Sequence, residues 1–142
     1  MRIIATILSA SLLLLPDILD AQDTARATSP KFPVIRFVKK STTVTKFAQK
    51  QLDSVIAISN QYPEKCIYLV VPDVPEEDEL KMLVWDRMNN IVAYIETKGF
   101  DLRKLGLSEE GSSDGNYSFE WMAECAPYEG SYEPPKQKKK TN

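Results

Sequence analysis

The clearest hydrophobic pattern in the chain is a helical repeat between residues 80 and 95. Its apolar positions recur three or four residues apart and are Leu80, Leu83, Val84, Met88, Ile91, Val92 and Ile95. This spacing predicts an amphipathic helix roughly 30 Å long. The acidic run 76–79 precedes the repeat, where a helix dipole favours negative charge, and a cation site is the alternative interpretation of that run. Lys98 and Gly99 follow the repeat and predict the helix end.

A second helical repeat lies between residues 44 and 59 and predicts a helix that ends before Pro63. The repeat places Phe47 on the buried stripe together with its other apolar members, and Ser41, Thr42 or Thr43 is expected to cap the helix start.

Four further segments have the composition of strands. Residues 33–39 and 100–107 alternate weakly, whereas 66–71 is continuously apolar, which is typical of a central strand covered on both faces. Residues 117–126 alternate clearly, and one face of that strand would carry Tyr117, Phe119, Trp121, Ala123 and Cys125. The predicted order is β-α-β-α-β-β. It indicates an α/β chain, specifically an α+β two-layer sandwich with both helices on one face of a small mixed sheet.

The first 21 residues have the pattern of a secretory signal peptide. Arg2 precedes an apolar run at 3–15 that is too short to span a bilayer, and cleavage is predicted after Ala21. An uncleaved N-terminal anchor is the alternative. The absence of a cysteine near residue 21 excludes lipoprotein attachment there. The prediction is therefore a periplasmic or cell-envelope protein with no transmembrane segment after cleavage.

The remaining sequence divides into a flexible leader at 22–32, a single domain at 33–127 and a Lys- and Pro-rich tail at 128–142 that we expect to be disordered. Lys136 and residues 138–140 of the tail either solubilise the protein or contact an acidic surface. Without Arg2, Asp17 and Asp20, the 18 basic and 20 acidic residues of the chain become 17 and 18. This near-neutral balance argues against a nucleic-acid partner.

The chain contains two cysteines, Cys66 and Cys125, and no histidine. In an oxidising compartment the cysteines can form a disulfide, and the alternative is two buried, unlinked thiols. The lack of histidine argues against a zinc or histidine-based metal site and excludes Ser-His-Asp and Cys-His catalysis. We therefore expect no enzyme, metal or cofactor.

The stretch around Arg87 resembles the OmpA-like, peptidoglycan-associating domain family. The family pattern has a leucine, a serine, two variable residues, an arginine and an alanine, followed by an apolar helix that ends in a glycine. Here Leu83, Val84, Arg87 and Met88 are followed by apolar positions and by Lys98-Gly99-Phe100. The resemblance covers about residues 33–126. The chain departs from the family where Val70-Val71-Pro72 replaces Gly-His-Thr, where Val84 replaces the serine and where Met88 replaces the alanine.

The resemblance implies that Arg87 and Asp73, the aspartate nearest to the family's ligand loop, bind the carboxylate and the amine of diaminopimelate in peptidoglycan. An arginine fork suits a carboxylate and an aspartate suits an ammonium. Because the ligand loop differs, the function expected first is a non-catalytic periplasmic interaction or scaffold module that binds another envelope protein. Peptidoglycan binding through Asp73 and Arg87 is the alternative.

Overall fold

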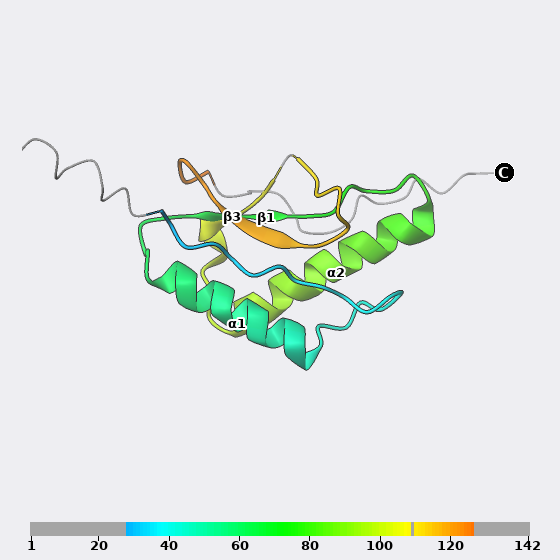
Figure 1. Ribbon diagram of the computed structural model, residues 1–142, viewed down its shortest axis with the longest axis horizontal. Helices are drawn as coiled ribbons and strands as arrows, with labels where there is room; N and C mark the ends of the chain where they lie inside the picture. Colours follow the sequence, from blue (N-terminus) through cyan, green and yellow to red (C-terminus); the bar gives the residue numbers. More distant parts are fainter. Residues whose placement is uncertain (1–27, 109, 127–142) are drawn as a thin grey trace, which may run out of the picture.

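The computed structural model describes residues 28–108 and 110–126, and it shows two helices packed on one side of a small sheet (Figure 1). The predicted signal peptide, most of the leader and the tail from residue 128 lie outside the described residues. The predicted α+β two-layer class is confirmed. None of the helices within 28–108 and 110–126 has both the length and the apolar composition needed to cross a bilayer.

The three-stranded sheet has the order β2-β1-β3. Strand β1 (Ile67–Val70) lies in the centre, parallel to β2 (Leu105–Leu107) and antiparallel to β3 (Ser118–Trp121). Ile67 is opposite Leu105 on one side and Trp121 on the other. The continuously apolar run at 66–71 therefore supplies the central strand, as its pattern predicted. The predicted strand at 100–107 is shorter, because a 3-10 turn, η1 (Leu102–Lys104), occupies part of it.

The predicted first strand at 33–39 is wrong. Only Ile35 pairs, in an isolated antiparallel bridge in which Ile35 and Tyr117 exchange both backbone hydrogen bonds, at 2.8 and 3.2 Å. Continuing this register would place Pro33 opposite Phe119. Proline has no N–H to donate, so the ladder stops after one pair.

Helix α1 (Lys46–Asn60) begins later than predicted. Its N-cap is Thr45, whose hydroxyl accepts a hydrogen bond from the Ala48 N–H at 3.2 Å, and not Ser41, Thr42 or Thr43. The buried stripe is Ala48, Leu52, Val55 and Ser59. Phe47 lies off that stripe and is 65% exposed, so its assignment to the buried face is corrected.

Helix α2 (Asp78–Thr97) runs from an acidic first turn to Gly99, which has a φ of 86°. A glycine in this left-handed conformation ends helices readily, which confirms the predicted stop. The helix buries Val84, Met88, Ile91, Val92 and Ile95, but Leu80 at its start is 42% exposed. Leu80 extends the sequence periodicity beyond the part of the helix that the sheet covers.

Strand β3 ends at Trp121, five residues before the end of the predicted strand. Tyr117 and Phe119 are buried as the alternation predicted, whereas Ala123 and Cys125 are exposed because the chain leaves the sheet before them. The core lies between the sheet and the two helices, and its fully buried members include Ile35, Leu52, Ile67, Leu69, Met88, Ile91, Ile95, Leu105 and Tyr117.

Candidate functional site

Arg87 projects from the middle of α2 toward the loop that precedes α1. Its Nε donates to the Ser41 carbonyl at 2.7 Å, and its Nη2 donates to the Val38 carbonyl at 2.9 Å. The guanidinium carbon lies 5.0 Å from the centroid of the Phe37 ring, within cation–π range. Two of the five guanidinium donors are therefore occupied by the backbone of the protein itself.

Asn90, one helical turn after Arg87, makes a third bond to the same loop. Its Nδ2 donates to the Thr42 carbonyl at 2.8 Å. Between these carbonyls the chain turns through Lys40, which has a φ of 59°, a conformation that non-glycine residues seldom adopt. Polar side chains of α2 thus satisfy the carbonyls of a tight turn that has no strand or helix partner of its own.

Asp73 is the second residue of the predicted ligand site. Its side chain is exposed, and its backbone N–H donates to the Ser112 carbonyl at 3.0 Å. Gly111 approaches so closely that a Cβ at that position would overlap the Asp73 carboxylate. The hydrogen bonds of Asp73 and those of Arg87 therefore go to different segments, and their joint binding of one ligand stays a prediction.

The loop that Arg87 and Asn90 hold, together with the first turn of α1, presents apolar and positively charged side chains, which we call the basic surface. It consists of Val38, Lys39, Lys40, Lys46 and Phe47, all of them exposed. The Val38 side chain is 61% exposed and the Phe47 side chain is 65% exposed, whereas large apolar side chains are usually buried. Its sequence signal is a charge bias: residues 28–52 contain six basic and no acidic residues.

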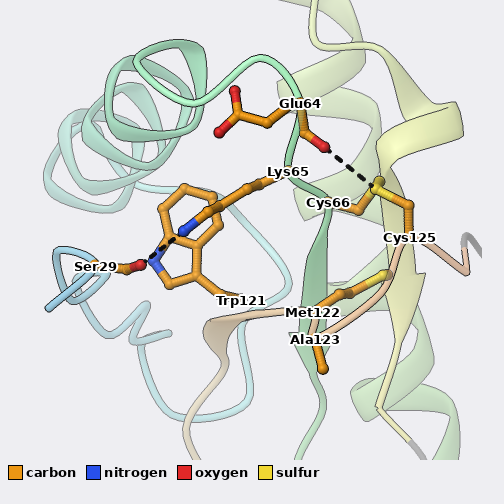
Figure 2. Close-up of a pocket in the computed structure, with 8 residues that line it drawn as sticks. All are labelled: Ser29, Glu64, Lys65, Cys66, Trp121, Met122, Ala123 and Cys125. Carbon is orange, nitrogen blue, oxygen red and sulfur yellow. Dashed lines mark hydrogen bonds between the residues drawn. A yellow bond between two sulfur atoms is a disulfide. The ribbon is translucent and has the colours of Figure 1, made fainter. Parts of the chain in front are cut away.

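A separate open pocket of about 450 Å³ lies beside the disulfide (Figure 2). Trp121 forms one wall, and the Lys65 side chain runs along it. The Lys65 Nζ donates to the Ser29 hydroxyl at 2.9 Å and lies 5.1 Å from the Tyr62 ring centroid and 5.4 Å from that of Trp121. This cation is thus held by groups of the protein itself.

Ser29 lines this pocket, and residues 30–32 continue along Trp121, although the sequence pattern places 29–32 in the leader. The Trp121 indole N–H donates to the Pro30 carbonyl at 2.9 Å, and the Phe32 and Trp121 ring centroids are 4.7 Å apart. Nothing in the local sequence indicates this contact, because Pro30 and Trp121 are 91 residues apart.

Cys66 and Cys125 form a disulfide, with their Cα atoms 5.2 Å apart, which confirms the pairing and excludes the alternative of two free thiols. The Cys125 sulfur also lies 3.8 Å from the Glu64 carbonyl oxygen (Figure 2). A disulfide sulfur has no proton to donate, so this contact is van der Waals packing. Within the described parts of the chain, no group of three or more Cys, Asp or Glu side chains could hold a metal ion.

Comparison of the chain with protein-family models, with curated proteins and with solved structures finds no match. The resemblance to the OmpA-like family therefore rests on the sequence pattern alone, which is clearest around Arg87.

Proposed function

We propose that the chain is an exported, non-catalytic interaction module of the cell envelope, and that it binds a protein partner through the basic surface. The disulfide supports export, because such bonds persist in oxidising compartments. The polar network from α2 supports a binding role for the loop, because a surface that is fixed before binding loses less conformational entropy on association.

The observation that carries the proposal is the exposure of Val38 and Phe47 among three lysines. Single exposed apolar residues are common, but two large ones on a rigid, like-charged surface are typical of a contact site. The charge of this surface fits an acidic partner surface.

Peptidoglycan binding through Arg87 and Asp73 is less well supported by the contacts of Arg87. A bidentate grip on a carboxylate needs two parallel guanidinium donors, whereas Nε and Nη2 already bind Ser41 and Val38. Binding a ligand with that edge of the guanidinium would require the loop to detach.

Site-specific photo-crosslinking tests the proposal. A photoreactive phenylalanine analogue at position 47 or 38 should form a discrete crosslinked species in cells that express the protein. The same probe at Glu96, an exposed position near the far end of α2, should not. Equal crosslinking at all three positions would contradict the proposal.

Retention on purified sacculi tests the alternative. We expect wild-type protein and Arg87→Ala to be retained equally weakly. Strong retention of the wild type that Arg87→Ala and Asp73→Ala both abolish would instead assign the peptidoglycan function to these residues.

A further inference from the structure

The exposed large apolar side chains of the described residues form two pairs that lie in segments of opposite charge. Val38 and Phe47 belong to the basic surface, and Val74 and Leu80 are 43% and 42% exposed. Val74 lies within a segment, 73–79, that contains five acidic and no basic residues, and Leu80 directly follows it. We call Asp73, Val74, Glu76, Glu77 and Leu80, which are all exposed, the acidic surface.

Local structure accounts for only part of this acidity. Asp78 and Glu79 lie in the first turn of α2, where the helix dipole stabilises them. Glu77 stands at the N-cap but its side chain caps no N–H, and Asp73 and Glu76 precede the helix. The charges are also unpaired, because among the residues described the ion pair of Arg103 with Asp101 is the only one found.

The loop of the basic surface lies at the same end of the long axis of the molecule as the acidic surface, and the start of α1 lies between that end and the middle (Figure 1). Figure 1 shows the loop at 38–42 and the start of α2 both at the right-hand end of the view. In an isologous dimer each contact occurs twice, so two copies meeting at this end about a two-fold axis can place each basic surface on the acidic surface of the other.

We propose that the partner of the basic surface is the acidic surface of a second copy of this chain. This inference rests on the proposed function and names its partner. The opposite charges would orient the encounter, and the contact would bury Val38, Phe47, Val74 and Leu80. An anionic lipid surface fits less well, since it would repel the acidic surface that lies at the same end.

Charge reversal tests the inference on the full chain, purified with its disulfide formed. Sedimentation at about 50 mM salt should show a dimer that weakens at about 500 mM salt, where charges are screened within a few ångströms. Lys39→Glu with Lys40→Glu, and separately Glu76→Lys with Glu77→Lys, should each raise the dimer dissociation constant about a hundredfold or more, because like charges then face each other.

An equimolar mixture of the two variants should restore a 1:1 dimer, since every contact again joins opposite charges. Glu96→Lys with Lys98→Glu, at the far end of α2, is the matched control and should leave the dimer intact. Failure of the mixture to pair would overturn the inference.

Three other outcomes would also overturn it. First, the wild type could remain monomeric at about 100 µM, a concentration at which even weak specific association is detectable. If position 47 then crosslinks to a different protein, the proposed function stands and this inference fails. The basic surface could bind vesicles of anionic phospholipid without dimerisation. Deletion of residues 128–142 could abolish the dimer, which would show that the Lys-rich tail, and not the basic surface, binds the acidic surface.

Discussion

Tyr117 links the sheet to α2 through one buried hydroxyl. The side chain is 1% exposed, and its hydroxyl donates to the Val84 carbonyl at 2.8 Å. Burial raises the pKa of Tyr117 well above its ordinary value, and the nearby Arg87 lowers it only in part. The folded state therefore keeps a proton that the unfolded chain releases near pH 10.

It follows that Tyr117 contributes stability that is fully present below about pH 10 and is lost as the pH rises toward the folded-state pKa. Tyr117→Phe should lower the free energy of unfolding by about 1 kcal/mol at neutral pH, through the lost hydrogen bond. It should also reduce the loss of stability between about pH 9 and 11, the range in which an unfolded tyrosine titrates. Urea unfolding at several pH values across that range measures this loss.

Tyr68→Phe is the control, because the Tyr68 hydroxyl makes no hydrogen bond within the described residues. If the free energy of unfolding of Tyr117→Phe fell with alkaline pH as steeply as that of the wild type, the prediction would be contradicted.

Gly111 and Gly115 lie in the same loop but have different reasons to be glycine. At Gly111 a Cβ would overlap the Asp73 carboxylate and would lie 3.1 Å from the Asp73 Cα and N, whereas at Gly115 the space is open and φ is 75°. Gly115→Ala should cost about 1 kcal/mol of unfolding free energy for the left-handed backbone. Gly111→Ala should cost about 1–3 kcal/mol, because the Asp73 carboxylate must turn away and the Asp73 backbone must shift by a few tenths of an ångström. If urea unfolding showed the same loss of unfolding free energy for both variants, the loop around Asp73 would be able to rearrange without an added cost.

At the scale of elements, the loop at 38–42 depends on α2 for its order. Arg87→Ala and Asn90→Ala remove three hydrogen bonds to the Val38, Ser41 and Thr42 carbonyls. A neutral hydrogen bond contributes about 1 kcal/mol, and each bond from the charged Arg87 guanidinium contributes at least as much, so the double variant should lose about 3 kcal/mol or more of local stability. Amide hydrogen exchange of residues 38–43 should accelerate about thirtyfold or more, while the interior of α2 stays protected. Asn89→Ala is the matched control on the same helix. Unchanged exchange in the loop would show that its own turn maintains it.

The sequence predicts the helices and strands better than it predicts which surfaces pack against them. Both helices were expected from their period, and the glycine stop of α2 was located because Gly99 acts locally. Phe47 lies beside the buried stripe of α1, and Leu80 lies beyond the covered part of α2, and a period reveals neither the edge nor the end of a neighbouring surface. The strand at 33–39 had suitable composition, yet Pro33 prevents its ladder from continuing past Ile35.

The candidate site was predictable only in part for the same reason. Arg87 was recognised as the important residue of α2, but its partners are carbonyls 46 and 49 residues away, and any residue type presents a carbonyl. The disulfide was one of two open alternatives, since sequence gives no Cα separation. The sequence does not reveal the basic surface, because the helical period places Phe47 on the buried face.

At the scale of the whole molecule, the disulfide joins the start of the central strand to the segment that follows the last one. Cys66 is buried and Cys125 is exposed, and the two are 59 residues apart in sequence. The loop that they close contains β1, α2, η1, β2 and β3, and therefore all three strands of the sheet. In the chain-entropy account, closing a loop of this length stabilises the fold by about 4 kcal/mol.

This magnitude matters because single domains of this size are usually stable by only about 5–15 kcal/mol. Cys66→Ser with Cys125→Ala should therefore lower the urea midpoint strongly, and the buried hydroxyl that the serine introduces would add a cost that Cys66→Ala avoids. We expect Cys66→Ala with Cys125→Ala to lose about 4 kcal/mol, and the wild type measured in excess dithiol reductant to lose a similar amount. If the reduced protein kept its oxidised midpoint, the packing of α1 and α2 on the sheet would suffice to hold β1 and β3 together.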